Sequence, residues 1–487
     1  MAVTQKALLA SVPTDLFIGG TWRPSASRDR FDVHDPATGA VRASVADGAV
    51  DDGRAALDAA VGAQDAWAAT APRERGEVLR AAYELMHERS EELAMLMTLE
   101  MGKPLAEARG EVVYAAEFFR WFSEEAVRIH GRYAVAPNGA TRLLTMKQPV
   151  GPTLMITPWN FPLAMGTRKI GPALAAGCTM VVKPAHETPL SMLALARLLE
   201  DVGVPGGVVN VITTTRSGAV CEPLITDARL RKLTFTGSTA VGKVLVRQSA
   251  EQLLRLSMEL GGNAPFVVFA DADLDKAVEG AMLAKFRNIG QACTAANRFI
   301  VQESVAAEFA RRLTERVGAM KIGRGTETGV TIGPLVSDAA VAGTDALVQD
   351  ALAHGATLLA GGKRPEGPGS FYEPTVLTNV APASAILTEE IFGPVVGIVT
   401  FADEAEAVRL ANSTEYGLIS YVFTQDLARG QRMIAKLETG MMGLNTGLVS
   451  NAAAPFGGVK QSGMGREGGL EGIQEYLSTK YTLIPVS

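Results

Sequence analysis

The spacing of hydrophobic positions changes near residue 150, and the two halves of the chain predict different elements. Residues 50–125 carry apolar side chains three to four positions apart, as at Leu79, Ala82 and Leu85, which is the repeat of an amphipathic helix. The preceding stretch ends its short apolar run at Pro13, so we expect a loose lead-in rather than a signal peptide. Residues 132–148 alternate polar and apolar side chains, which predicts a strand or a hairpin.

After Gly151, short apolar runs alternate with helical stretches. This texture is typical of parallel strands that are buried on both faces of a sheet, so we predict a doubly wound α/β architecture. The C-terminal residues 481–484 are aromatic, β-branched and apolar, which predicts a strand that pairs with another segment, for example one of another subunit. The internal strands are expected at residues 153–157, 179–182, 208–212, 232–235, 266–269 and 298–301.

Length and composition exclude several classes of protein. A chain of 487 residues corresponds to about three domains and can bury a large core without disulfides or metals. The net charge of −6 argues against a general nucleic-acid binder. The sequence has no run of about 18 apolar residues, so we expect no membrane span. Three cysteines without a CxxC pair argue against a disulfide framework or a metal site, and they favour a reducing, cytoplasmic setting.

A glycine-rich turn follows the strand expected at residues 232–235. Such a turn, when it opens a helix, presents free backbone N–H groups and the positive end of a helix dipole to a phosphate. The spacing from Gly237 to Lys243 is GxxxxGK, but Val244 stands where a nucleotide-hydrolase loop needs Ser or Thr to hold magnesium. A tight turn that only packs a helix on a sheet explains this segment equally well.

Three further side chains are candidates for chemistry. Cys293 lies in a small polar loop and is a candidate thiolate nucleophile, although most lone cysteines are inert and buried. Glu259 precedes a Gly-Gly pair that lets backbone approach a ligand, although a single Glu at a strand end is usually only a solvated charge. Asn160 lies between two prolines that fix its backbone, so its amide can stabilise an oxyanion or merely satisfy the local loop.

Taken together, these segments resemble aldehyde dehydrogenases. Seven motifs occur in the order and at the spacing of that family, and the resemblance covers the chain from about residue 17 to residue 481. The motifs are PWNFP at 158–162, KPA at 183–185, FTGS at 235–238, MELGGNAP at 258–265, GQACTAANR at 290–298, EEIFGPV at 389–395 and PFGGVKQSGMGRE at 455–467.

The resemblance implies a mechanism. Cys293 attacks the aldehyde carbon, and the Asn160 amide with the Cys293 backbone N–H holds the oxyanion. Hydride leaves for a nicotinamide, and Glu259 activates the water that hydrolyses the resulting thioester. The residues expected around the cofactor are Thr157, Pro158, Trp159, Lys183, His186, Gly237, Ser238, Glu390 and Phe392. Of these, Lys183 would bind the adenosine ribose, Gly237 and Ser238 would lie under the pyrophosphate, and Glu390 would hold the nicotinamide ribose with Phe392 packed beside it.

Cofactor preference depends on the residue at the adenosine 2′ position. NAD-preferring members often carry a carboxylate there, which repels the 2′-phosphate of NADP. The matching residue is His186, which cannot repel a phosphate, so we expect NADP or NAD with NADP slightly favoured. Glu187 follows directly and restores a carboxylate if the loop is shifted by one residue.

The segments around the nucleophile resemble the succinate-semialdehyde dehydrogenase subfamily. Arg168, Arg287 and Ser450 match the residues that this subfamily uses for the distal carboxylate of its substrate, and bidentate arginine suits a carboxylate. The resemblance therefore implies oxidation of succinic semialdehyde to succinate. Alternatives are that these arginines form structural salt bridges, or that the substrate is glutarate semialdehyde or a simple aliphatic or aromatic aldehyde.

The resemblance also implies a domain organisation. Residues 1–130 and 150–258 would form a Rossmann-type dinucleotide-binding domain, and residues 259–471 an α/β catalytic domain. A small β element of residues 131–149 and 472–487 would bridge subunits of a homodimer or homotetramer. An alternative function of another class is a cofactor-independent cysteine thioesterase, which would not need Lys183 or Glu390. A second alternative is a non-catalytic relative, which would not need Cys293, Glu259 or Asn160.

Overall fold

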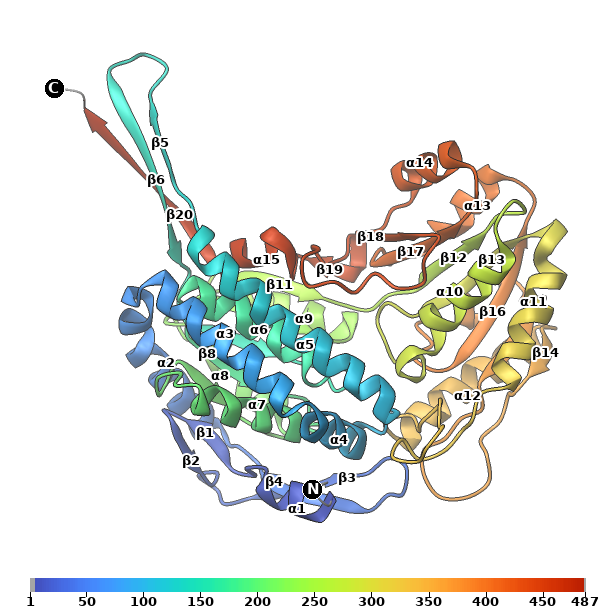
Figure 1. Ribbon diagram of the computed structural model, residues 1–487, viewed down its shortest axis with the longest axis horizontal. Coiled ribbons are helices and arrows are strands. Elements are labelled where there is room, and N and C mark those ends of the chain that lie inside the picture. The colour runs from blue at the N-terminus through green and yellow to red at the C-terminus, as the bar shows by residue number, and fades with distance from the viewer. Residues whose placement is uncertain (1–4, 486–487) are drawn as a thin grey trace.

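The computed structural model describes residues 5–485 and shows two α/β bodies with a projecting arm. In Figure 1 the first body, blue to green, lies beside the second, yellow to orange. The arm leaves the first body and ends near the C-terminus of the chain. The predicted α/β fold is confirmed, because each body is built on a largely parallel sheet covered by helices.

The first body contains an eight-stranded sheet of order β19-β11-β10-β7-β8-β9-β1-β2. Its central strands β11 to β9 are parallel, and the strands at both ends are antiparallel. The expected strands at residues 153–157, 179–182, 208–212 and 232–235 are all present. The bounds are β1 (Leu16–Ile18), β2 (Thr21–Arg23), β7 (Thr153–Ile156), β8 (Met180–Lys183), β9 (Val209–Val211), β10 (Lys232–Thr236), β11 (Arg255–Glu259) and β19 (Gly463–Met464).

Both faces of this sheet are buried, as the uninterrupted apolar runs predict. Met155 of β7 packs into the core on one face, while its neighbour Leu154 packs into a separate core on the other. The helical repeat over residues 50–125 is confirmed as four helices. The helices of this body are α2 (Val50–Ala69), α3 (Pro72–Glu88), α4 (Ser90–Met101), α5 (Leu105–Glu125), α6 (Ala164–Ala176), α7 (Leu190–Asp201), α8 (Ser217–Ile225), α9 (Thr239–Ser249) and α15 (Gly469–Gln474).

The second body contains a seven-stranded sheet of order β14-β15-β16-β13-β12-β17-β18, parallel except at β14. The strands expected at residues 266–269 and 298–301 are its β12 and β13. The strands are β12 (Ala264–Val268), β13 (Ala296–Gln302), β14 (Thr357–Ala360), β15 (Thr375–Thr378), β16 (Val395–Phe401), β17 (Ile419–Phe423) and β18 (Met441–Leu444). The helices are α10 (Leu274–Phe286), α11 (Glu303–Gly318), α12 (Asp338–Ala353), α13 (Glu404–Ala411) and α14 (Leu427–Lys436).

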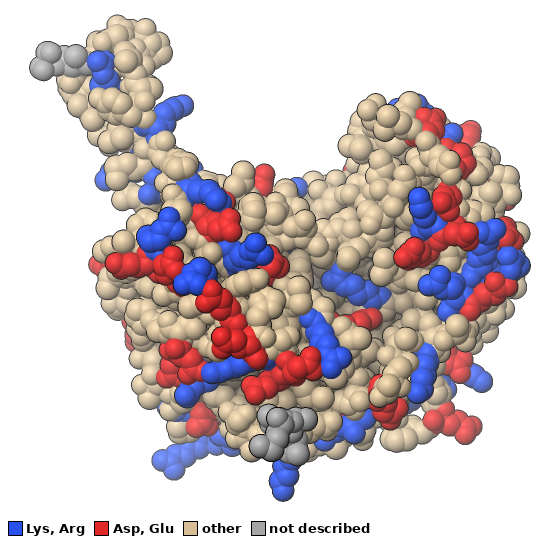
Figure 2. Space-filling model, in the orientation of Figure 1, with Lys and Arg blue, Asp and Glu red and all other residues tan. Residues whose placement is uncertain are grey.

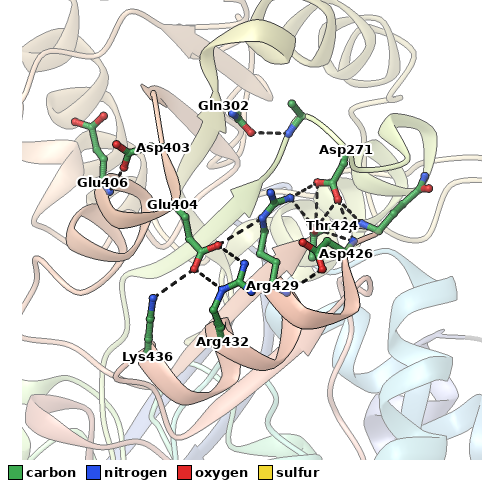
Figure 3. A network of polar contacts seen from close by, with 12 residues as sticks. Asp271, Gln302, Asp403, Glu404, Glu406, Thr424, Asp426, Arg429, Arg432 and Lys436 are labelled. Carbon is green, nitrogen blue, oxygen red and sulfur yellow. Dashed lines mark hydrogen bonds and ion pairs between the residues drawn. The ribbon is translucent and has the colours of Figure 1, made fainter.

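A polar network fastens α13 and α14 to the end of the second sheet (Figure 3). Glu404, at the start of α13, accepts two hydrogen bonds from Arg432 of α14, at 2.8 and 2.7 Å. Arg429 of α14 donates at 2.6 Å to Asp271, which also accepts the backbone N–H groups of residues 425 and 426. These ion pairs hold the outer helices of this body in place.

The arm is a three-stranded antiparallel sheet of order β20-β6-β5. It confirms the hairpin expected at residues 132–148 and the C-terminal strand expected at 481–484, which here pairs with β6 of its own chain. Large apolar side chains on the arm are exposed, among them Tyr133 and Tyr481. The bounds are β5 (Arg132–Val135), β6 (Thr141–Pro149) and β20 (Leu477–Pro485).

The N-terminal prediction needs correction. Residues 5–11 form a helix, α1 (Gln5–Ser11), rather than a loose lead-in, because buried Leu8 packs against the first core; residues 1–4 lie outside the described residues. Among the described helices, none is long and apolar enough to cross a membrane. The remaining elements are β3 (Arg30–His34), β4 (Val41–Ala46), η1 (Ala126–Arg128), η2 (Arg287–Gly290), η3 (Ala385–Leu387) and η4 (Lys460–Ser462).

Candidate active site

A cavity of about 240 Å³ is lined by residues that follow the carboxyl ends of β7 and β10 in the first sheet and by residues that precede β13 and β16 in the second. The structure brings most of the predicted site residues to its wall, although they come from segments far apart in the sequence. Thr157, Lys183 and His186 lie outside this wall. The predicted residues that line it are Pro158, Trp159, Asn160, Arg168, Gly237, Ser238, Glu259, Arg287, Cys293, Glu390, Phe392 and Ser450.

Cys293 follows a turn with an unusual backbone. Asn288, Ile289 and Gly290 have φ values of 54, 62 and 74°, so three consecutive residues are left-handed, and a β-branched residue such as Ile rarely adopts this conformation. The Asn288 amide secures the turn by donating to the carbonyls of Asn160 and Gln291, both at 2.9 Å. A side chain at Gly290 would lie 2.3 Å from the Gly393 carbonyl oxygen, so only glycine fits.

The Cys293 side chain is partly exposed at the cavity, whereas the other two cysteines are buried. Burial raises the pKa of the Cys293 thiol to about 12; the Arg168 charge opposes this shift, while Glu390 and Glu259 add to it. The thiol is therefore neutral near pH 7 and must lose its proton to a base as it attacks.

Asn160 is a rigid, buried amide. Its Nδ2 donates to the Gln291 carbonyl at 3.0 Å and its Oδ1 accepts the Phe161 N–H at 3.1 Å. Its backbone carbonyl accepts hydrogen bonds from Lys103 Nζ at 2.8 Å and from the Asn288 amide. Because Nδ2 carries two hydrogens and one is committed to Gln291, the other is available to an oxygen in the cavity.

Glu259, the last residue of β11, is 1% exposed. Among the described residues, neither of its carboxyl oxygens has a hydrogen-bond partner. Burial, and then repulsion from Glu467, raises the pKa of Glu259 well above its usual value, while Arg168 and Lys169 oppose the shift. A buried carboxyl with free oxygens and a raised pKa has the properties of a general base that works near neutral pH.

Arg168 is completely buried and forms an ion pair with Glu467, whose other oxygen contacts Lys169. The structural salt bridge considered above for Arg168 is therefore present. The same arginine also lines the cavity, stacks 4.1 Å from the Phe456 ring, and has an Nη2 with no hydrogen-bond partner among the described residues. It can bind an anion in the cavity while it holds Glu467.

Arg287 and Ser450, which both line the cavity, are in direct contact. Arg287 Nη1 donates to Ser450 Oγ at 3.1 Å, and the guanidinium lies 5.1 Å from the Phe161 ring. In contrast to Arg168, Arg287 forms no ion pair within the described part of the chain. Its charge is thus available to a carboxylate.

Several of the residues expected around a cofactor lie at or just after the carboxyl ends of β7 and β8. Lys183 is nearly buried and donates to Ser217 Oγ at 2.9 Å, while Thr157 Oγ1 is buried without a hydrogen-bond partner among the described residues. Exposed His186 lies 3.3 Å from a Glu187 oxygen. Ser238 caps α9, whose first turn follows β10 as predicted.

In the wall of the cavity, Trp159 and Phe392 meet edge to face with ring centroids 5.4 Å apart. Glu390 accepts the Gly262 N–H at 3.2 Å, and burial raises its pKa to about 7, against that hydrogen bond and the Lys285 charge. A side chain at Gly261 would lie 2.9 Å from the other Glu390 oxygen, so the Gly-Gly pair makes room for this carboxylate.

Several functional neighbours were not singled out from the sequence. Glu467 is the last residue of the PFGGVKQSGMGRE motif and Lys169 is next to Arg168, so their positions in the sequence could have indicated that they are near the site. Nothing in the local sequence indicates that Lys103, Glu107 and Asn288 are near it. Within the described residues, no cluster of three or more His, Cys, Asp or Glu side chains could hold a metal ion.

Comparison with known proteins identifies the class. The aldehyde dehydrogenase family matches residues 22–482, and the chain belongs to this family. It is 57% identical to a succinate-semialdehyde dehydrogenase of Paenarthrobacter nicotinovorans, over 90% of this chain and 98% of that one. A glutarate-semialdehyde dehydrogenase of Pseudomonas putida is 49% identical over 96% of this chain and 97% of its own. A crystal structure of an E. coli NADP-dependent enzyme matches with a TM-score of 0.96 and 49% identity, covering 98% of both chains.

Proposed function

We propose that this aldehyde dehydrogenase oxidises succinic semialdehyde to succinate with a nicotinamide cofactor. The observation that carries the proposal is the Arg287–Ser450 contact in the wall of the same cavity that Cys293 lines. A carboxylate bound there would place an aldehyde at the far end of a short chain near the thiol. The relative from Paenarthrobacter nicotinovorans carries the same activity in its name.

The chain supplies the nucleophile, the base and the oxyanion donors of the reaction. Cys293 Sγ bonds to the aldehyde carbon while its proton leaves to Glu259 or to water, because the thiol is neutral before attack. The free hydrogen of Asn160 Nδ2 and the Cys293 backbone N–H stabilise the oxyanion. The nicotinamide supplies the hydride acceptor that converts the adduct to a thioester. Glu259 then takes a proton from the water that hydrolyses this thioester.

The residues present fit a dinucleotide. The orphaned Thr157 hydroxyl and the nearly buried Lys183 offer polar groups to a ribose, and the N-terminus of α9 behind Ser238 suits a pyrophosphate. Glu390 would hold the second ribose, with Phe392 and Trp159 beside it. We propose that NADP and NAD both bind and that NADP is slightly favoured, because His186, which we assign to the 2′ position, is exposed and cannot repel a phosphate. The matching E. coli enzyme is named as NADP-dependent.

Other aldehydes are the main alternative. A glutarate semialdehyde has the same terminal carboxylate with one more methylene, and the relative from Pseudomonas putida is named for it. A simple aliphatic or aromatic aldehyde would leave the positive charge of Arg287 without a counter-ion. A cofactor-independent thioesterase would not need residues such as Lys183, Thr157 and Glu390, which suit the riboses of a dinucleotide.

We also propose a domain and subunit organisation. Residues 1–130 and 150–258, which supply most of the first sheet, form the dinucleotide-binding domain; residues 259–471, which supply the second sheet, form the catalytic domain. The arm of residues 131–149 and 472–487 joins subunits of a homodimer or homotetramer. Its support is that the projecting arm, at the upper left of Figure 2, carries exposed apolar side chains, among them Tyr133, Val135 and Tyr481 at 65, 57 and 57% exposure. A cytoplasmic location fits the three free cysteines.

A substrate panel tests the proposed function. We expect kcat/KM of the native enzyme to be highest for succinic semialdehyde among succinic semialdehyde, glutarate semialdehyde and butanal. Arg287→Ala removes a charge-assisted contact that contributes about 1.5–3 kcal/mol, or roughly tenfold or more in kcat/KM for the acid-bearing aldehydes. Butanal should be affected much less. Equal losses for all three aldehydes would show that Arg287 is structural and that the substrate assignment is wrong.

A further inference from the structure

A second cavity, of about 470 Å³, adjoins the active-site cavity. The two share Tyr114, Phe161, Arg287 and Ser450, so the guanidinium of Arg287 stands at the boundary between them. The second cavity also contains three charged side chains that the mechanism does not use: Lys103, Glu107 and Glu111. If one of these three side chains carries a charge that no neighbour neutralises, that charge will change how strongly Arg287 binds an anion.

Lys103 and Glu111 balance each other. They are 1% and 3% exposed, and Lys103 Nζ donates to Glu111 Oε2 at 2.5 Å. Glu111 Oε1 accepts the N–H groups of Leu163 and Ala164 at 3.0 and 3.1 Å, at the start of α6. The remaining charges of this cavity are therefore Glu107 and Arg287.

Glu107 is fixed beside Arg287 through the backbone. Its Oε2 accepts the Asn288 N–H at 2.5 Å, and this N–H belongs to the peptide bond that joins Arg287 to Asn288. Asn288 is itself held in the left-handed turn by its side-chain bonds to Asn160 and Gln291. The carboxylate thus cannot move away from the arginine without breaking a short, charge-assisted hydrogen bond.

We propose that Glu107 is a specificity-determining residue, whose negative charge weakens the hold of Arg287 on the carboxylate of the substrate. The inference rests on the proposed function, because it needs an acid-bearing aldehyde at Arg287. Two carboxylates near one guanidinium repel each other, so the bound substrate favours the protonated, neutral form of Glu107. Substrate binding and proton uptake by Glu107 are then coupled, and each promotes the other.

Desolvation of the Glu107 carboxyl places this coupling near neutral pH. Burial raises the pKa of Glu107 to about 7; the hydrogen bond from Asn288 and the charges of Lys103 and Arg287 oppose the rise, and Glu111 adds to it. Below this pKa Glu107 is neutral and Arg287 attracts the substrate carboxylate with its full charge. Above it, the ionised Glu107 competes, so the KM for an acid-bearing aldehyde rises with pH.

The test compares succinic semialdehyde with butanal, which has the same number of carbons and no charge. The ratio of their kcat/KM values cancels the ionisation of Cys293 and Glu259, which both substrates need. For the native enzyme we expect this ratio to fall by about tenfold between about pH 6 and pH 9, where the substrate carboxylate stays ionised. Glu107→Gln keeps an oxygen to accept the Asn288 N–H but removes the charge, so the ratio should stay high across this range.

Glu117→Gln is the matched control, because Glu117 is also on α5 but pairs with Arg120 on the surface. It should follow the native profile. If Glu107→Gln also follows the native profile, or lowers kcat/KM equally for both aldehydes, the inference is overturned. Should that variant not fold, a pH-independent ratio in the native enzyme overturns it as well. Failure of the proposed function is distinguishable, since the native enzyme would then show no preference for succinic semialdehyde at any pH.

Discussion

Arg168 and Glu467 form a buried ion pair at the wall of the active-site cavity, 299 positions apart in the sequence. Arg168 places a positive charge near both Cys293 and Glu259, and this charge opposes the rise in the pKa of each, whereas Glu467 adds to the rise at Glu259. Arg168 therefore has two effects on the reaction: it can contact the substrate anion, and it favours the ionised forms of the nucleophile and the base.

Arg168→Ala should therefore shift the pH profile of the enzyme. Without the positive charge the pKa of Glu259 rises further, so the decline of kcat toward low pH should begin at a higher pH than in the native enzyme. The shift should appear with butanal as well as with succinic semialdehyde. Arg168→Lys retains the charge and should keep the native profile. An unchanged profile in Arg168→Ala would show that this charge does not act on Glu259.

Asn160→Ala should lower kcat for every aldehyde. The variant loses an oxyanion donor, and such a loss typically costs about 10²–10³-fold in rate. Because Asn160 is also tied to Gln291, far-UV circular dichroism and the melting temperature must be recorded to show that the fold is retained. A folded variant with near-native kcat would remove Asn160 from the mechanism.

His186→Glu should move cofactor preference toward NAD. A carboxylate at this position repels the 2′-phosphate of NADP and accepts a hydrogen bond from the 2′-hydroxyl of NAD. The neighbouring carboxylate of Glu187 lies 3.3 Å from His186, so Glu187→Gln should move the preference the opposite way. The measurement is kcat/KM for both cofactors at saturating aldehyde. Two variants with the native cofactor ratio would show that neither side chain reaches the 2′ group.

Glu404→Gln should destabilise the second body. The pKa of Glu404 is lowered to about 2, mainly by the hydrogen bonds from Arg432. The hydrogen bond from Lys436 and the charges of both residues add to this, while desolvation of the carboxylate opposes it. A lowered pKa means that the stabilisation is present above about pH 4.5 and is lost as the pH falls toward 2. We expect a loss of about 1 kcal/mol in the free energy of unfolding at neutral pH, since the network is partly exposed.

Chemical unfolding of Glu404→Gln at neutral and acid pH checks this, and the difference from the native protein should shrink as the pH falls. Glu315→Gln is the control, because Glu315 pairs with Arg311 on the exposed surface of α11 and should cost less. Equal losses in the two variants would show that the network around Glu404 adds nothing beyond an ordinary surface pair.

The sequence predicts the elements whose signal is local. Apolar runs such as that of β8 must be strands buried on both faces, and the repeat over residues 50–125 has the period of a helix. Strand β11 has a weaker local signal, because its start, Arg255 and Leu256, mixes polar and apolar residues; its pairing with β10 completes it. Helix α1 forms for a similar reason, since Leu8 is buried by helices that follow much later.

The chemistry of the site divides in the same way. Cys293, Glu259 and Asn160 stand in recognisable motifs, whereas their electrostatic surroundings come from tertiary contacts. No local rule predicts that Ile289 adopts a positive φ, because the conformation is disfavoured for that side chain and only Asn288, Gly290 and the surrounding core impose it. The local sequence of α5 likewise does not predict a role for Glu107, because its contact with the Asn288 N–H exists only in the folded protein.

The central claim is that Cys293 is acylated by an acid-bearing aldehyde and that Glu259 supports hydrolysis of the thioester. The most direct measurement is the mass of the Cys293 peptide from Glu259→Gln, mixed with succinic semialdehyde and NADP and then quenched with acid. The account predicts one equivalent of reduced cofactor in a burst and a succinyl group on Cys293, which Cys293→Ala lacks. A Glu259→Gln variant that turns over at the native steady-state rate with an unmodified Cys293 would contradict it.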